Sequence, residues 1–477
     1  MTKKIVVLGA GPAGGAVALG LKRLGYSVQT VGEPRPFSAV EGISDRVVEG
    51  LRYAGFNRVI ANLPDPSARN AVWNGEHNSA NTERLIDRQQ VDQLIIEDLR
   101  AAGIEVIEAK VSKVLEQADD TDTNADINNT GVGFVIRLAD GHELNADFLV
   151  EARGRAAPSA HLPRVRGPET LSLLQYWQGP ETERGSAAVS LADGWAWMAK
   201  MESGKRYLQL TLDVGANKSS NSTKTSDINA VASNGDGNNS SGSHKLPGKE
   251  QLADYCRQRF EQIPEAGEFM ADAEPVGIPH GRTSTPILCE QTVGSNWLRV
   301  GDAAMAVDPL SGNGIFQGLS SALQAPAVIN TLLKYPERKV LVEQFYQQRV
   351  SGLFYRFARI GRDFYAMEQQ WTDHPFWQQR NQWPDAEPMH QSVSFDQLEI
   401  KAMPVVNDGV IDEQEVVVTP DQPLGIWHLA GIPLANVVRA VREKASDQSL
   451  DVCLQSLSLD AKQIMMLLRW LRSMGCR

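Results

Sequence analysis

Six residues near the N-terminus, Gly9-Ala10-Gly11-Pro12-Ala13-Gly14, constrain the fold of this chain more than any other feature. Residues 3–8 before them, with the apolar run 5–8, are typical of a buried strand, and residues 13–24 after them are typical of a helix. In this context Gly9 allows a tight turn, Gly11 lets the backbone approach a pyrophosphate, and Gly14 allows the helix to pack closely on the strand. Peptide N–H groups at the start of the helix would bind the phosphates. The segment therefore predicts a dinucleotide-binding βαβ unit with a parallel sheet.

The acidic residue that binds a dinucleotide ribose is expected where the second strand, residues 26–31, ends. Glu33 is the candidate, although Gly32 occupies the position that one counts to first. If the strand is one residue longer, Glu33 comes into place. The alternative is a surface glutamate in a Gly-Glu-Pro turn, and the sequence leaves both open.

A second glycine-rich segment begins with Gly301-Asp302-Ala303-Ala304, directly after the apolar residues 297–300. An aspartate at a strand end can accept hydrogen bonds from sugar-like hydroxyls. The segment continues through Asp308-Pro309 to a Gly312-Asn313-Gly314 turn before a helix, whose N–H groups and dipole would lie beside an electron-rich ring edge. Such a ring edge is that of a reduced flavin. The segment predicts flavin contacts at Asp302, Pro309, Gly312, Asn313 and Gly314.

Length and patterning predict an α/β protein with more than one domain, because 477 residues exceed what one simple core needs. We expect a discontinuous, Rossmann-like FAD-binding domain at residues 1–170 and 270–365. Residues 171–269 form short apolar runs that predict a second, mostly antiparallel sheet for the substrate. Residues 366–477 are expected to form a helical C-terminal module. The polar residues 119–131 predict a long hairpin tip, and the polar insertion 216–245 is expected to be disordered, because it cannot bury enough apolar surface.

Charge and cysteine content exclude several classes of function. The net charge of −11 argues against binding of nucleic acid or an anionic membrane. The four cysteines are widely separated and form no Cys/His cluster, so we expect no metal site and reduced thiols. We also expect no signal peptide and no transmembrane segment, and hence a cytoplasmic protein.

Taken together, the two glycine-rich segments resemble the glutathione-reductase-type FAD monooxygenases and tryptophan halogenases, over about residues 1–360. The resemblance implies FAD as the cofactor. Shorter matches imply further FAD contacts at Gly42, Ile43 and Ser44 beside the isoalloxazine, Arg88 near the ribityl chain or pyrophosphate, and Val111 near the adenine. Residues 148–154, which include Ala152, match a segment that usually reads Asp-Gly or Thr-Gly, but Arg153 stands in that place.

Residues 193–199 resemble the W-x-W-x-I-P signature of the halogenases, with Met198 and Ala199 in place of Ile and Pro. Alternation places Trp195 and Trp197 on one face of a strand, as a wall of the substrate pocket or as two core residues. Those halogenases also need an early lysine, but this sequence has none between Lys22 and Lys110. The resemblance therefore favours oxygenation of a substrate over its halogenation.

The whole chain is similar to the LodB/GoxB-type flavoproteins, which implies that its substrate is a tryptophan in a partner protein. The reaction would be oxygenation of that side chain in an amino-acid oxidase precursor that acquires cysteine tryptophylquinone, with NAD(P)H or another reductant. A small-molecule aromatic hydroxylase that uses NAD(P)H and an FAD-stabilised maturation scaffold without turnover are the alternatives. The catalytic residue stays unassigned, with His280 and Pro309 as candidates.

Overall fold

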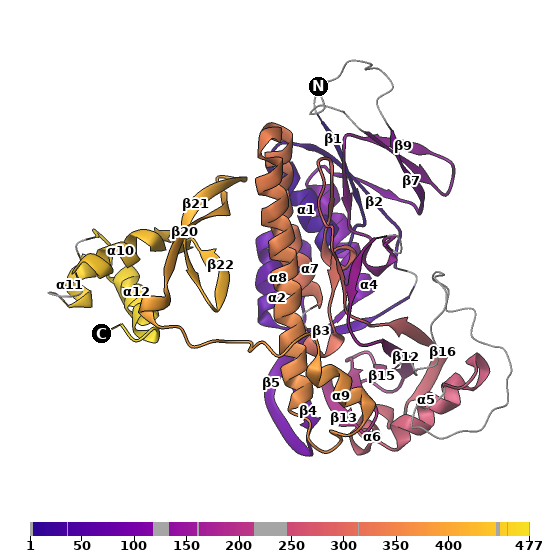
Figure 1. Cartoon of the computed structure of the whole chain (residues 1–477). Coiled ribbons are helices and arrows are strands. Elements are labelled where there is room, and N and C mark those ends of the chain that lie inside the picture. The colour runs from indigo at the N-terminus through magenta and orange to yellow at the C-terminus, as the bar shows by residue number, and fades with distance from the viewer. Residues whose placement is uncertain are drawn as a thin grey trace. The chain divides into compact units, whose positions relative to one another are not determined.

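The computed structural model describes residues 3–35, 37–117, 133–159, 162–213, 246–312, 314–444, 449–455 and 457–476 (Figure 1). The predicted hairpin tip, the predicted disordered insertion and Asn313 all lie outside the described residues. The chain divides into two compact units: Met1–Leu323 with Leu353–Ala386, and Gln324–Gly352 with Glu387–Arg477. Among the described residues, no helix combines the length and the apolar character needed to span a membrane.

A parallel sheet of five strands forms the centre of the first unit, in the order β18-β10-β1-β2-β6. The strands are β1 (Lys4–Leu8), β2 (Ser27–Gly32), β6 (Glu105–Glu108), β10 (Phe148–Glu151) and β18 (Trp297–Arg299). Ile5, Val6, Val7 and Leu8 are all completely buried, as expected for a strand covered on both faces. The predicted parallel α/β sheet is therefore confirmed.

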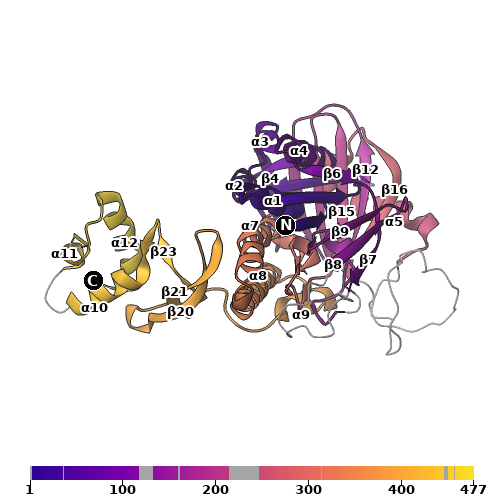
Figure 2. The same ribbon diagram turned by 90° about the horizontal axis from the view of Figure 1, so that it is seen from above.

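Helices cover one face of this sheet, and a small antiparallel sheet covers the other. Gly15 of α1 (Pro12–Arg23) lies against Ile95 of α4 (Arg88–Ala101) and against Phe56, which precedes α3 (Asn57–Ala61). Figure 2 shows these helices and α2 (Asp45–Ala54) grouped together. On the other face, Val6 and Leu8 share a core cluster with Ile136 of the sheet made by β7 (Val111–Gln117), β8 (Gly133–Leu138) and β9 (Glu143–Ala146).

The second large sheet of this unit has eight strands in the order β16-β12-β15-β14-β13-β4-β5-β3. Four of them, β12 (Thr170–Gln178), β13 (Gly185–Leu191), β14 (Gly194–Lys200) and β15 (Lys205–Asp213), come from the segment predicted to form this sheet. The others are β3 (Val40–Ile43), β4 (Ser67–Trp73), β5 (Glu76–Asp87) and β16 (Glu274–Thr283). Every neighbouring pair is antiparallel except β13 with β4. The sheet is mostly antiparallel, as predicted, but it also takes strands from the predicted flavin segments.

Residues of β14 alternate between the two faces of this sheet. Ala196 and Met198 belong to a core cluster with Phe260 of α5 (Leu252–Glu261) and Phe269 of α6 (Gly267–Met270). Trp195 and Trp197 contact a different, aromatic cluster. The prediction that both tryptophans share a face is therefore confirmed. A further small sheet joins β11 (Arg164–Arg166), β17 (Ile287–Cys289) and β19 (Met305–Ala306).

Two long helices, α7 (Gly314–Lys334) and α8 (Lys339–Ala366), each contribute residues to both compact units. Residues 366–386, including α9 (Pro375–Gln382), belong to the first unit. The predicted domain boundaries concern which segments bind flavin and which bind substrate, and they stay a prediction.

The second unit has its own core. It contains β20 (Glu399–Asn407), β21 (Val410–Thr419), β22 (Gln422–Ile426), β23 (His428–Leu429), β24 (Ile432–Pro433), α10 (Leu434–Lys444), α11 (Leu450–Gln455) and α12 (Ala461–Ser473). Leu467 and Leu471 of α12 are completely buried and share a cluster with Val437 and Leu454. The apolar face of this last helix is therefore used in core packing.

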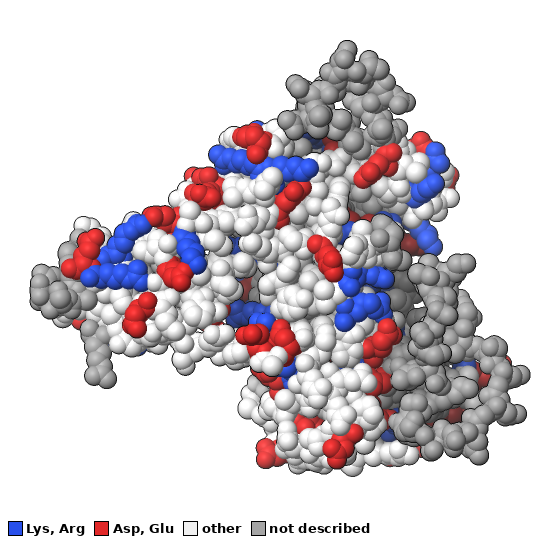
Figure 3. Space-filling model, viewed as in Figure 1, with Lys and Arg blue, Asp and Glu red and all other residues white. Residues whose placement is uncertain are grey.

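Acidic and basic side chains are intermixed on the face of the molecule drawn in Figure 3. No part of that face that belongs to described residues gathers Lys and Arg into one broad patch.

Candidate active site

The predicted flavin residues meet at one edge of the parallel sheet. Gly9 follows β1, Glu33 follows β2, Ala152 follows β10, and Asp302 follows β18 closely. Because the four strands are parallel, their carboxyl ends lie at the same edge, where open α/β sheets bind their ligands. Contacts join segments that are far apart in sequence: a Cβ added at Gly301 would lie only 2.8 Å from the Ala13 Cβ.

The three glycines of the first motif have different surroundings. Gly9 has a φ of +117°, and a Cβ added there would lie 2.3 Å from the Ala152 carbonyl oxygen. A Cβ at Gly14 would lie 1.9 Å from the Gly9 carbonyl oxygen. At Gly11, by contrast, an added Cβ has no neighbour within 4 Å among the described residues outside its own helix turn. Gly9 and Gly14 are thus required by the fold, whereas Gly11 leaves space for a ligand.

The start of α1 is suited to an anion. Gly11 is the N-cap residue and supplies no side-chain hydrogen bond to the first turn, while Pro12 occupies the first turn. Peptide N–H groups at such an end keep their capacity to donate, and the helix dipole favours negative charge there. The motif therefore fits a pyrophosphate.

The surroundings of Gly32 and Glu33 indicate which residue at the end of β2 could bind the ribose. A Cβ at Gly32 would lie 2.8 Å from the Ala10 Cβ, so Gly32 packs directly on the glycine-rich loop. β2 ends at Gly32, and Glu33 is the next side chain, exposed at the same sheet edge. This placement supports Glu33 as the ribose ligand, which stays a prediction.

Arg88 is the most strongly paired of the predicted ligands. It begins α4, whose N-cap Asp87 accepts a hydrogen bond from the Gln89 N–H. The buried guanidinium donates to Glu41 Oε1 at 2.8 Å and to Asp92 Oδ1 at 3.1 Å. Burial disfavours its charge, but the two carboxylates outweigh this and raise the pKa of Arg88. The side chain is therefore a fixed cation.

The other predicted FAD contacts lie in β3, at the start of α2 and at the start of β7. Gly42 is in β3, where a Cβ would overlap the Glu83 carboxylate, 2.0 Å from its Oε2. Ile43 is buried in the same strand, and Ser44 is the N-cap residue of α2. Val111 begins β7, shortly after β6 ends at the carboxyl edge of the parallel sheet.

The second motif forms a tight turn before α7. Asp308 accepts a hydrogen bond from the Leu310 N–H at 2.9 Å and so caps the short 3-10 helix Pro309–Ser311. Gly312 follows with a φ of +61°. Added Cβ atoms at Gly312 and Gly314 would meet no described residue outside their immediate chain neighbours, so this turn also leaves space on one side. Asn313 lies outside the described residues.

Two arginines follow strand β10. One contacts the second glycine-rich motif, and the other contacts the last residue of β10. Arg155 Nε lies 3.7 Å from Asp302 Oδ2, and its guanidinium donates to the Thr285 carbonyl oxygen at 2.7 Å. Arg153, which stands where the resemblance expects another residue, donates from Nε to Glu151 Oε1 at 2.9 Å. Arg153 is thus paired with Glu151, two residues earlier in the chain, while Arg155 is paired with Asp302 of the flavin motif.

The two predicted pocket tryptophans differ. Trp195 is buried, and its indole N–H donates to the Tyr365 hydroxyl at 3.1 Å. Trp197 is partly buried, with its ring centroid 5.4 Å from that of Tyr207. Trp195 is therefore a hydrogen-bonded member of the aromatic core, and Trp197 is the more accessible of the pair.

The structure does not bring the candidate His280 to these tryptophans. His280 is exposed on β16, and β12 and β15 lie between β16 and the strand of Trp195. Its ring lies 6.4 Å from the Phe37 ring. Pro309, the other candidate, lies in the turn capped by Asp308.

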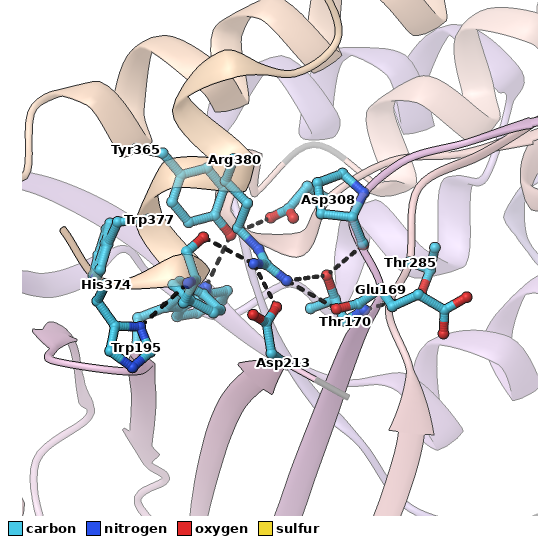
Figure 4. A network of polar contacts seen from close by, with 12 residues as sticks. Glu169, Thr170, Trp195, Asp213, Thr285, Asp308, Tyr365, His374, Trp377 and Arg380 are labelled. Carbon is cyan, nitrogen blue, oxygen red and sulfur yellow. Dashed lines mark hydrogen bonds and ion pairs between the residues drawn. The ribbon is translucent and has the colours of Figure 1, made fainter. Parts of the chain in front are cut away.

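The sequence did not reveal the polar network in Figure 4, in which Asp308 is joined to Tyr365 and Arg380 makes several of the contacts. Tyr365 of α8 donates to Asp308 Oδ1 at 2.9 Å. Arg380 of α9 forms an ion pair with Asp213 Oδ1 at 2.6 Å. The motif pointed to Asp308, but no local pattern marks Tyr365 or Arg380.

The parallel sheet, the converging glycine motifs and the antiparallel sheet beside them define a class: an FAD-dependent flavoprotein of the monooxygenase and halogenase fold. The flavin-dependent halogenase CmlS shares this fold with a TM-score of 0.72, at 16% identity over 100% of this chain and 96% of its own. No family model matches the chain.

The family follows from a nearer relative. A solved structure of QhpG, a peptidyl tryptophan dihydroxylase essential for tryptophylquinone cofactor biogenesis, is 47% identical to this chain. The alignment covers 100% of both chains with a TM-score of 0.79. The chain therefore belongs to the family of this dihydroxylase, which confirms the predicted fold and the predicted class of FAD-dependent, monooxygenase-like oxidoreductase.

More distant relatives are flavoenzymes of several kinds. The tryptophan 2-halogenase of Chondromyces crocatus is 23% identical over 76% of this chain and 68% of its own length. The menaquinone reductase of Mycobacterium tuberculosis is 23% identical over 69% of this chain and 76% of its own.

Proposed function

We propose that this protein hydroxylates a tryptophan side chain within a polypeptide, using FAD, as a step in the formation of a tryptophylquinone cofactor. The observation that carries the proposal is the 47% identity with QhpG over the full length of both chains. The site supports it, because both flavin motifs are present and meet at one sheet edge.

Bound FAD would supply the activation of molecular oxygen and the transfer of an oxygen atom. An indole ring is electron-rich, so it can attack an activated oxygen without a strong base from the protein. The chain's own residues have the tasks of binding and orientation: the Gly9–Gly14 loop and Arg88 hold the cofactor, and the face with Trp197 borders the substrate. His280 and Pro309 stay predictions as catalytic groups.

The proposal is tested by co-expressing a quinoprotein oxidase precursor with this protein and weighing the precursor by mass spectrometry. We expect its mass to increase by two oxygen atoms, located on one tryptophan by peptide sequencing. A Gly11→Ala variant, which should fold but bind FAD poorly, serves as the control. Equal masses with and without the wild-type protein would contradict the proposal. A mass gain that persists with an FAD-free variant would favour a maturation scaffold instead.

We also propose that the substrate protein is an amino-acid oxidase precursor and that NAD(P)H or another donor reduces the flavin. Anaerobic addition of NADH or NADPH to the purified protein separates the donors. Rapid bleaching of the flavin without precursor would identify the nicotinamide as the direct donor, whereas no bleaching would require another one. A cytoplasmic location belongs to the same proposal.

A further inference from the structure

The second flavin motif is tied to the rest of the first unit by a chain of three buried side chains. Trp195 donates from its indole N–H to the Tyr365 hydroxyl at 3.1 Å, and Tyr365 lies 2.9 Å from Asp308 Oδ1. An indole N–H can only donate, so the Tyr365 oxygen accepts that bond and its own hydrogen points to Asp308. The direction of the whole chain is therefore fixed; Figure 4 draws the three residues and the contacts between them.

Asp308 is in turn the residue that shapes the flavin turn. The same Oδ1 atom accepts from the Leu310 N–H at 2.9 Å, which holds the 3-10 helix Pro309–Ser311 closed. Asp308 is buried, and a buried carboxyl oxygen that loses a donor carries an uncompensated desolvation cost. A change in its bond to Tyr365 should therefore move the turn as well.

Arg380 of α9 lies beside the Tyr365 ring. Besides its ion pair with Asp213, it donates to the Thr170 hydroxyl at 2.8 Å and to the Phe376 carbonyl oxygen at 2.9 Å. Its guanidinium carbon lies 5.9 Å from the centre of the Tyr365 ring. Arg380 is almost completely buried, so it has one defined position from which its charge acts on Asp308.

We propose that Tyr365 is a positioning residue for the flavin: it fixes the Asp308 carboxyl and, through it, the turn formed by Pro309–Ser311 and Gly312, while the buried charge of Arg380 stabilises the ionised carboxyl. Tyr365 reaches the turn through its hydrogen bond to Asp308, and Leu310 of the turn packs against the aromatic cluster that contains Tyr365. The inference rests on the placement of FAD at this turn but not on the identity of the substrate. Its test uses no substrate, so its failure is distinct from a failure of the proposed function.

The charges around Asp308 predict how the flavin responds to pH. Burial raises the pKa of Asp308, while Arg380, the Leu310 N–H, Tyr365 and Arg155 oppose that rise. Burial and the Asp308 charge raise the pKa of Tyr365 well above its ordinary value, so Tyr365 stays a donor and Asp308 is the member that titrates. An ionised Asp308 would oppose negative charge on the reduced flavin. Reduction should therefore be accompanied by extra proton uptake over one range of pH.

The first test compares FAD binding by Tyr365→Phe and Tyr355→Phe variants, with flavin fluorescence as the measure. Tyr355 is on the same helix, and its ring packs edge-on against Phe354. We expect the FAD dissociation constant to rise about tenfold for Tyr365→Phe, the loss of one buried hydrogen bond, and less than about twofold for Tyr355→Phe. Equal constants for the two variants would overturn the proposal.

The second test measures the midpoint potential of the bound flavin against pH. Wild-type protein should show a range of steeper slope, which Asp308→Asn should abolish. Removing the Tyr365 donor or the Arg380 charge destabilises the carboxylate, so Tyr365→Phe and Arg380→Gln should move that range to higher pH. If these residues had a purely structural role, their variants would weaken FAD binding without moving the pH range of the steeper slope. If Tyr365→Phe does not fold, Asp308→Asn, which keeps the side-chain volume, still decides, because a slope unchanged from wild type in that variant would overturn the proposal.

Discussion

The Arg88 guanidinium lies between Glu41 and Asp92, and this pairing makes one variant especially informative. In Arg88→Gln, both carboxylates lose their cation. We expect the free energy of unfolding to fall by about 2 kcal/mol, below the ~3–5 kcal/mol of a fully buried pair because Glu41 is partly exposed. The FAD dissociation constant should rise at least about tenfold, since a charge-assisted contact is lost. Urea unfolding and flavin fluorescence measure the two effects.

Arg100→Gln is the matched control, on the same helix. Arg100 pairs with Glu108 at the surface, where such pairs contribute little. Unfolding and FAD binding should both stay near wild-type values. If Arg88→Gln lowered stability but left FAD binding unchanged, Arg88 would be a structural residue rather than a cofactor ligand.

Gly11 and Gly14 provide a second prediction at the residue scale, because their surroundings are opposite. Gly14→Ala places a methyl group against the Gly9 carbonyl oxygen and should lower stability by about 1–3 kcal/mol. Gly11→Ala finds open space, but Ala is less favourable than Gly at the N-cap, so apoprotein stability should fall by at most about 1 kcal/mol. Yet FAD affinity should fall by more than about tenfold, since the methyl group occupies the approach of the pyrophosphate. Tight FAD binding by Gly11→Ala would place the cofactor elsewhere.

At the scale of elements, Asp87 joins three segments. It caps α4 through the Gln89 N–H, forms an ion pair with Lys205 of β15 at 3.0 Å and accepts from the Ser38 hydroxyl at 3.1 Å. Asp87→Ala should lower the free energy of unfolding by about 1–2 kcal/mol through loss of the cap. Asp87→Asn keeps the cap and removes only the charge.

These two variants also separate cap from charge by their response to pH. Burial acts to raise the pKa of Asp87, but Lys205, Gln89 and Ser38 outweigh it and lower the pKa. The stability that the charge contributes is therefore complete above the unfolded pKa of about 4 and is lost as the pH falls through the lower, folded pKa. The difference between wild type and Asp87→Asn should be constant near pH 6 and vanish in acid. A constant difference at all pH values would contradict this assignment.

The elements that could be predicted are those whose sequence motifs are contiguous in the chain. Strand β1, the glycine loop and α1 are contiguous, so a short stretch of sequence specified them, and β18 with the Asp302 segment is similar. The eight-stranded sheet needed pairing of β13 with β4 across a long separation, and no local pattern encodes that partner. The same holds for Tyr365, which lies 57 residues beyond Asp308. The motifs therefore predict where the cofactor binds, whereas Tyr365 and its contact with Asp308 became visible only in the packed structure.

At the scale of the whole molecule, the two compact units should respond differently to the cofactor. All predicted FAD contacts that the structure describes belong to the first unit, while the second has a separate core around Val437 and Leu467. FAD at a hundredfold excess over its dissociation constant should stabilise the unit that binds it by about 2.7 kcal/mol. Hydrogen exchange of full-length protein should show protection at α1, α4 and the Asp308 turn, and little change in α10 and α12. The Gly11→Ala variant under the same conditions should lose that protection. Equal protection of α12 and α1 would show that cofactor binding stabilises both units as one.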